Sequence, residues 1–153
     1  RRQRQMCIRD SKYIDTPQKY YFEDLGLRNA RIGFRQVEET HLMENLIYNE
    51  LRIRGYLVDV GVVPTRVKDA DGAYRRSQLE VDFVCNRGSE RVYVQSAYRL
   101  PTEEKRKQEM ASLLKIDDSF RKIIITEDLI KRHMDENGVE WVNVYDFLKS
   151  EEL

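Results

Sequence analysis

The chain has 153 residues, of which 41% are hydrophobic and 35% charged, a composition typical of a globular protein with one domain. Its 27 basic and 27 acidic residues cancel, which excludes a protein-wide positive field that would attract nucleic acid or anionic lipid. Any binding to DNA must therefore come from a local basic patch.

The sequence has no feature of a membrane or secreted protein. No apolar run approaches the roughly 20 residues of a spanning helix, and no segment resembles a signal peptide. Cys7 and Cys85 lie far apart, which gives no support to a zinc site or a disulfide framework. We therefore expect a cytoplasmic protein with no membrane partner. Because the first residue is Arg1 and not Met, we also expect the natural chain to begin upstream.

The N-terminal segment differs from the rest of the chain. Residues 1–11 show no helical or strand periodicity, and we expect them to form an arm. Two short runs, Tyr13-Ile14 and Tyr20-Tyr21-Phe22 with Asp24-Leu25-Gly26, flank Thr16-Pro17. This pattern predicts a hairpin with its turn at the proline.

After residue 40 the sequence alternates between helical and strand patterns. Apolar residues at three- and four-residue steps predict a helix over 41–54 that ends at Gly55, and Thr102 is expected to cap a second helix that reaches about residue 115. A third helix is expected from Tyr145. The predicted strands are 56–63, 79–85, 92–98, 122–126 and 141–144, and the polar connection at 66–77, with Asp71-Gly72, suits a hairpin turn.

Two carboxylates are candidate site residues. Glu44 lies on the first predicted helix, at the edge of its apolar arc. Asp82 lies on the second predicted strand, where strict alternation would place it with Glu80 on the face opposite Phe83. An aspartate inside an apolar strand is unfavourable, which favours a functional or vestigial role for Asp82.

This order of elements, with a glutamate on the helix and an aspartate on the strand, resembles the core of the PD-(D/E)xK nuclease superfamily. The combined pattern also resembles the nuclease-fold domain of unknown function that follows the ATPase module in prokaryotic AAA-type ATPases, over residues 13–148. The motifs that carry the resemblance include Lys19-Tyr20-Tyr21-Phe22, Glu80-Val81-Asp82-Phe83-Val84 and Val94-Gln95-Ser96-Ala97-Tyr98.

The resemblance implies a restriction-endonuclease-like α/β fold, a mixed sheet flanked by helices, over residues 29–153. Residues 1–28 would then be an arm and part of a winged-helix wing. It also implies that the partner of this domain is the protein's own N-terminal ATPase domain. The chain has no Gly-x-x-x-x-Gly-Lys-Ser/Thr loop to hold phosphates, so ATP would bind only in that absent domain.

In the nuclease superfamily, carboxylates hold Mg²⁺ and a lysine on the third strand adds a cation beside the phosphate. Here Gln95 replaces one carboxylate and Ala97 replaces the lysine. The catalytic set implied by the resemblance is therefore Glu44, Asp82 and Gln95, of which Glu44 and Asp82 remain as metal ligands. We expect a degenerate site that binds Mg²⁺ weakly or not at all.

Three functions are compatible with this pattern. The leading hypothesis is a degenerate nuclease-fold module that binds DNA or a partner protein. The first alternative is an active Mg²⁺-dependent DNA endonuclease whose cation has moved to Arg99, Lys105 or Arg106. The second is a structural or oligomerisation domain, which the zero net charge favours. Glu50 falls inside the apolar arc of its helix and is expected to pair with an arginine, the alternative being a second site carboxylate.

Overall fold

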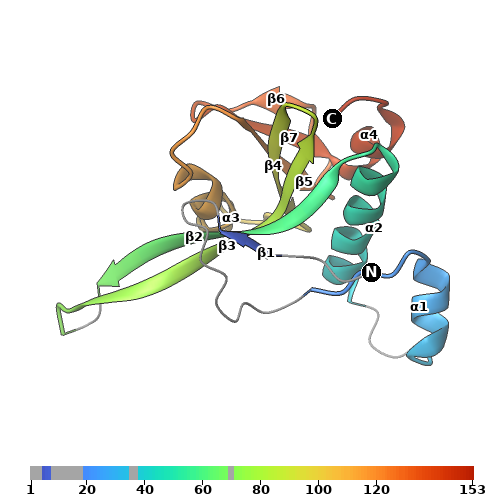
Figure 1. Cartoon of the computed structure of the whole chain (residues 1–153), viewed down its shortest axis with the longest axis horizontal. Coiled ribbons are helices and arrows are strands. Elements are labelled where there is room, and N and C mark those ends of the chain that lie inside the picture. The colour runs from blue at the N-terminus through green and yellow to red at the C-terminus, as the bar shows by residue number, and fades with distance from the viewer. Residues whose placement is uncertain (1–4, 8–18, 35–37, 69–70) are drawn as a thin grey trace.

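The computed structural model describes residues 5–7, 19–34, 38–68 and 71–153, and the side chains of 19–34, 38–67 and 71–153 (Figure 1). Within these ranges the protein is a mixed sheet flanked by helices. The helices are α1 (Leu25–Arg31), α2 (Glu39–Ile53), α3 (Glu103–Leu114) and α4 (Val144–Lys149). The strands are β1 (Gln5–Cys7), β2 (Leu57–Lys68), β3 (Tyr74–Arg87), β4 (Glu90–Ala97), β5 (Arg121–Thr126), β6 (His133–Met134) and β7 (Val139–Asn143).

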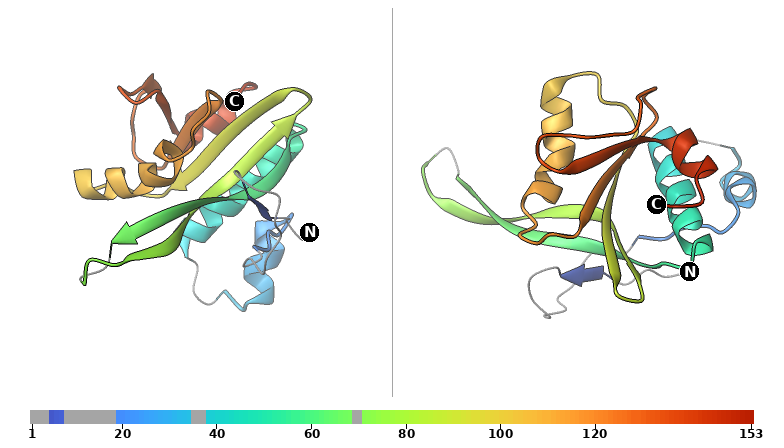
Figure 2. Two further views of the ribbon diagram at one scale, coloured as in Figure 1. Left: turned by 60° about the vertical axis from the view of Figure 1, so that its left-hand side comes forward. Right: turned by 90° about the horizontal axis from the view of Figure 1, so that it is seen from above.

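The described strands form one sheet in the order β1-β2-β3-β4-β5-β7-β6. β2, β3 and β4 are an antiparallel meander, whereas β5 pairs parallel with β4, and β7 pairs parallel with β5. Parallel neighbours need a crossover between them, and α3 provides the one between β4 and β5. α2 and α3 lie on opposite sides of the sheet, as Figure 2 shows from above.

Each side of the sheet has its own hydrophobic core. The α2-side core includes Met43, Ile47, Tyr48, Leu51, Phe83, Cys85, Val92, Val94, Ile123 and Ile125. The α3-side core includes Val63, Val81, Val84, Tyr93, Ala97, Met110, Leu113, Ile124 and Trp141. Because Ile124 lies in one core and its two neighbours lie in the other, β5 is buried on both faces. The continuous apolar run at 122–126 predicted such a central strand.

The polar connection predicted at 66–77 contains the expected turn at Asp71-Gly72, but most of its length belongs to the strands on either side of that turn. β2 and β3 continue through it in unbroken register, with Val63 paired to Leu79 and Lys68 paired to Tyr74. Beyond Val63 the two strands leave the body of the protein as a two-stranded arm (Figures 1 and 2). Gly72 has a φ of 79°, a conformation that suits the tight turn at the end of the arm.

The N-terminal predictions are wrong where the structure describes these residues. Gln5–Cys7, expected in an arm, form β1 parallel to Val60–Val62 of β2. The second strand of the predicted hairpin is reduced to a bridge at Tyr20. Asp24 then caps α1, because its carboxylate accepts a hydrogen bond from Leu27 N at 2.8 Å. The first predicted strand and its turn, over 13–17, lie outside the described residues.

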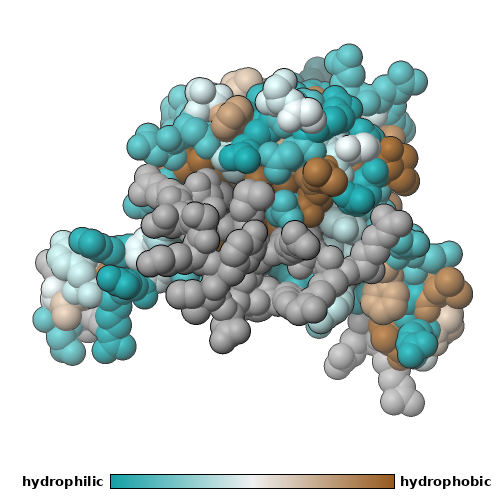
Figure 3. Space-filling model, in the orientation of Figure 1, coloured by the Kyte–Doolittle hydropathy of each residue, from teal (hydrophilic) through white to brown (hydrophobic). Residues whose placement is uncertain are grey.

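α1 buries none of its residues, although its sequence is partly apolar. Leu27 is 70% exposed, and Ile32 and Phe34, just beyond the helix, are exposed as well. Figure 3 shows the resulting brown area at the lower right, over α1. No helix in the described part of the chain combines the length and the apolar character needed to cross a bilayer.

Candidate functional site

A β-bulge in β3 turns Asp82 toward α2. Asp59 pairs with Val84 while Gly61 pairs with Val81, so Asp82 and Phe83 together oppose one residue of β2. A bulge of this kind breaks the alternation of side chains. Val81 consequently packs in the α3-side core, whereas Phe83 packs in the α2-side core. The strict alternation expected over 79–85, with Asp82 and Phe83 on opposite faces, is wrong at this point.

The carboxylates of Glu44 and Asp82 meet at the ammonium group of Lys19. Lys19 Nζ lies 2.9 Å from Glu44 Oε1 and 2.9 Å from Asp82 Oδ1. It also lies 3.3 Å from Glu80 Oε1. The side chains of Glu44 and Asp82 are only 13% and 12% exposed. The structure therefore brings the two predicted acids together around a cation that was not among the predicted site residues.

The segment that carries Lys19 is fixed to α2 by polar contacts. Asn45 of α2 accepts a hydrogen bond from Phe22 N at 2.9 Å and donates one to Phe22 O at 2.8 Å. Tyr21 stacks on Tyr48 with 4.3 Å between ring centroids, and its hydroxyl donates to Glu44 Oε1 at 2.5 Å. These contacts fix the backbone of 19–22 against α2, so Lys19 is held in a defined position at the carboxylates.

Asp82 is satisfied on both of its oxygens. Ser96 N of β4 donates to Asp82 Oδ2 at 2.9 Å, while Lys19 occupies Oδ1. Burial raises the pKa of Asp82 to about 6, although Lys19 opposes the shift. Burial disfavours the charged form of Lys19, but the nearby Asp82 and Glu44 outweigh it and raise the pKa of Lys19 above its usual range. Lys19 therefore remains an ammonium group at neutral pH.

The raised pKa of Asp82 predicts a specific pH dependence. The folded protein binds the Asp82 proton more tightly than the unfolded chain does, so this contribution to stability is full below about pH 4 and lost as the pH rises through about 6. Asparagine cannot ionise. The free energy of unfolding of the wild type minus that of Asp82→Asn should therefore fall by up to about 3 kcal/mol between pH 4 and pH 7.

Urea denaturation at several pH values measures this difference. A wild-type stability that rises relative to Asp82→Asn between pH 4 and pH 7 would contradict the assignment.

Gln95 and Ala97 lie on the other side of the sheet. β4 pairs with β5 without a bulge, so side chains alternate along it, and Gln95 and Ala97 point to the same face as Tyr93. Both Tyr93 and Ala97 pack in the α3-side core. From that side, Gln95 Oε1 accepts a hydrogen bond from Asp82 N at 3.3 Å. Gln95 thus supports the backbone at the bulge, and its side chain does not join the carboxylates of Glu44 and Asp82.

The three cations proposed as replacements for the missing lysine have other partners. Arg99 Nε pairs with Glu127 at 3.1 Å, and Lys105 pairs with Glu109 at 2.7 Å. The guanidinium of Arg106 lies over the ring of Trp141, 4.5 Å from its centroid. Glu50 pairs with Arg54 at 2.9 Å, which is the structural role expected for it.

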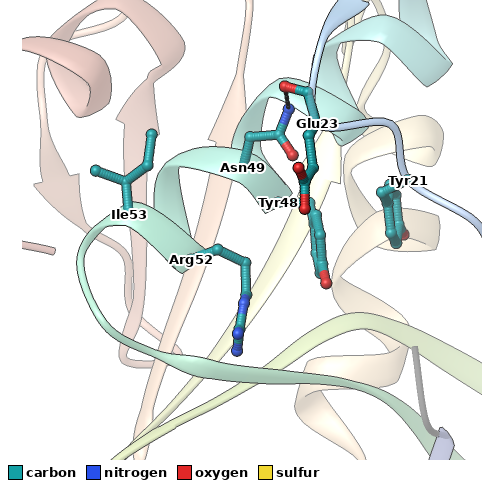
Figure 4. A pocket seen from close by; sticks show the side chains of 6 residues that line it. All are labelled: Tyr21, Glu23, Tyr48, Asn49, Arg52 and Ile53. Atoms are coloured by element: carbon teal, nitrogen blue, oxygen red, sulfur yellow. Dashed lines mark hydrogen bonds between the residues drawn. The ribbon is translucent and has the colours of Figure 1, made fainter. Parts of the chain in front are cut away.

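Tyr21 lines two pockets. The first, of about 290 Å³, opens at the ion cluster and is lined by Lys19, Tyr20, Tyr21, Arg28, His41, Glu44 and Asn45. The second, of about 320 Å³, is lined by Tyr21, Glu23, Tyr48, Asn49, Arg52 and Ile53 (Figure 4). In the second pocket Asn49 donates to Glu23 O at 3.2 Å, so the same N-terminal segment forms one wall of both pockets.

The site residues do not fit Mg²⁺ as they stand. Among the described residues, no group of three His, Cys, Asp or Glu side chains is arranged to hold a metal ion. The ammonium group of Lys19 lies between the two carboxylates that would be the principal ligands. Gln95 is turned to the backbone of Asp82. Lys19 therefore already occupies the position between Glu44 and Asp82 and pairs with both carboxylates.

Comparisons with known proteins add a relative but no function. No protein-family model matches the chain, and no solved structure matches it. An uncharacterized protein of Haemophilus influenzae is 32% identical over 145 residues, which is 95% of this chain. The chain spans 32% of the length of that curated relative.

Proposed function

We propose that this chain is a restriction-endonuclease-like domain with a degenerate, non-catalytic nuclease site, and that it serves a larger cytoplasmic AAA-type ATPase as a binding module. The observation that carries the proposal is the position of Lys19 Nζ, 2.9 Å from both Glu44 and Asp82. A positive charge of the chain itself stands where the nuclease mechanism requires a metal ion.

The arrangement of elements supports the fold part of the proposal. α2 precedes an antiparallel meander of β2, β3 and β4, and α3 then crosses to a parallel β5. Glu44 lies on the helix and Asp82 on the second strand of the meander, as the resemblance implies for the nuclease core. This correspondence covers the sheet, the crossover and the positions of Glu44 and Asp82.

The charges of the cluster support the non-catalytic part. Mg²⁺ loses its water reluctantly and is held by several carboxylate oxygens. Here a divalent cation would have to displace Lys19 from Glu44 and Asp82, and Gln95 brings no third negative charge. The loss of the third-strand lysine also removes the cation that would stabilise the transition state.

We expect the chain to produce no cleavage of supercoiled plasmid with Mg²⁺ or Mn²⁺ above the level of its Asp82→Ala variant. The reason is that Lys19 lies between the two carboxylates that would hold the metal ion, and position 97 carries an alanine in place of the lysine. Agarose electrophoresis of time courses measures nicking. If the wild type nicks the plasmid and Asp82→Ala abolishes the nicking, the active-endonuclease alternative with Lys19 as the catalytic cation replaces this proposal.

We assign the contact with the ATPase part to α1 and the residues just after it. Leu27, Ile32 and Phe34 are exposed there, and α1 has no buried residue of its own. Apolar side chains that are exposed together on one element are typical of an interaction site. It lies on the opposite side of the molecule from the β2–β3 arm, so the two surfaces are available to separate partners (Figure 1).

A further inference from the structure

The arm formed by residues 64–79 of β2 and β3 has no role in the carboxylate cluster. It projects from the body (Figures 1 and 2), and none of its described side chains, those of 64–67 and 71–79, is fully buried. A two-stranded ribbon without a packed face is only marginally stable in water. Residues 64–79 contain four basic residues and two acidic ones, so the arm is positive in a protein whose total charge is zero.

Two of these basic residues face each other. Arg66 and Arg76 are direct partners in the ladder, and both are exposed. Within the part of the chain that the structure describes, neither arginine side chain forms a hydrogen bond or an ion pair. Like charges directly opposite each other destabilise a ribbon. An anionic ligand that contacts both guanidinium groups would relieve this repulsion.

The same face of the ribbon continues in both directions from the arginine pair. Tyr74 follows toward the tip and is 70% exposed. Toward the body, the period of two places Gln78 and then Glu80 on this face, and Glu80 belongs to the Lys19 cluster. The acids at the base of the arm repel phosphate, so an anionic polymer would contact the outer part of the arm.

We propose that this arm binds duplex DNA, with Arg66 and Arg76 on the phosphates and the ribbon in the major groove. The strands of a ribbon lie about 4.8 Å apart, and a major groove about 12 Å wide admits a two-stranded ribbon with its side chains. The deep, narrow major groove of duplex RNA does not. The inference rests on the proposed function and deepens it, because it names duplex DNA as the ligand of the binding module, but it does not depend on the state of the nuclease site.

Binding of the 153-residue chain to a fluorescent 30-base-pair DNA duplex, measured by anisotropy at several salt concentrations, tests the inference. Arg66→Ala with Arg76→Ala should weaken binding by roughly tenfold or more, because hydrogen bonds to charged groups are lost. The slope of log affinity against log salt should become less steep by about 2, one unit for each phosphate contact removed. Circular dichroism of each variant checks that the fold is retained.

The matched control is Lys107→Ala on α3 with Lys115→Ala just after it, which removes the same charge from exposed positions elsewhere. It should leave both the affinity and the salt slope close to those of the wild type. Parallel titrations with duplex RNA and with anionic lipid vesicles identify the polyanion. The inference is overturned if the DNA duplex is not bound, if the two double variants bind alike, or if RNA or vesicles are bound as tightly as DNA.

The plasmid assay separates this inference from the proposed function. Plasmid nicking together with loss of binding in the arginine variant would remove the non-catalytic assignment and leave the arm as the DNA contact. If the replacement of Arg66 and Arg76 leaves DNA binding unchanged and no nicking occurs, the arm is not the DNA contact. The assignment of a non-catalytic module then stands.

Discussion

Lys19→Ala should bind Mg²⁺ and Mn²⁺, whereas the wild type should not. Removal of the ammonium group leaves Glu44, Asp82 and Glu80 close together without a compensating charge. In the present arrangement no three such side chains of the described residues are placed to hold a metal ion, but without the ammonium group these carboxylates can turn toward one cation, and their oxygens are the ligands that these ions prefer. We expect the metal-free variant to be less stable than the wild type by about 2 kcal/mol, a value below that of a fully buried pair because the Lys19 side chain is 26% exposed.

Thermal unfolding with EDTA and with millimolar Mg²⁺ or Mn²⁺ measures both effects. A ligand at a hundred times its dissociation constant adds about 2.7 kcal/mol, which for a chain of this size raises the melting temperature by roughly 5 to 10 °C. Lys19→Arg is the matched control, since it retains the positive charge and should show no metal-dependent shift. If Mg²⁺ stabilises the wild type as much as the alanine variant, Lys19 does not close the site.

Lys19 shows where sequence reasoning about this site reached its limit. The sequence predicts Glu44 and Asp82 as site residues because they stand on the first helix and the second strand, where the nuclease superfamily has its acids. Lys19 is 25 residues from Glu44 and 63 from Asp82, so no spacing rule connects them. The signal was present in the Lys19-Tyr20-Tyr21-Phe22 motif, but its meaning depends on Asn45, which fixes that segment against α2.

The bulge in β3 could not be predicted from hydrophobic periodicity. Leu79, Val81, Phe83 and Cys85 alternate in the sequence as if they shared one face, yet Val81 and Phe83 pack on opposite sides of the sheet. An extra residue in a strand changes the face of everything beyond it, and apolar residues on both sides hide the change. The face of Asp82 was therefore inferable only from its partners in space.

The sequence patterns predicted neither the full length of the arm nor α1. Sequence patterns report elements through the side chains that they bury, and neither the outer half of the β2–β3 ribbon nor α1 buries a face. Polar residues at 66–77 are typical of a loop in composition, although the backbone continues the ladder to Tyr74. For α1 the Asp24 cap was the available signal, and the aromatic residues before it favoured a strand.

Ala97→Lys should destabilise the protein by about 4 kcal/mol or more and should not create a nuclease site. The superfamily pattern requires a lysine at this position, but Ala97 is 3% exposed and packs in the α3-side core with Leu113 and Trp141. An unpaired ammonium group in apolar surroundings is among the most costly substitutions in a folded protein. From this side of the sheet the lysine would not reach Glu44, which lies on α2.

Urea denaturation of Ala97→Lys beside Ala97→Met separates charge from volume. Methionine adds a similar chain length without charge and should cost only about 1 to 3 kcal/mol. Burial lowers the pKa of a lysine, so the folded variant binds its proton less tightly than the unfolded chain does. The deficit of Ala97→Lys relative to Ala97→Met should therefore shrink as the pH rises from 7 to 10. A lysine variant as stable as the methionine one, with new Mg²⁺-dependent plasmid nicking, would instead place residue 97 beside the carboxylates.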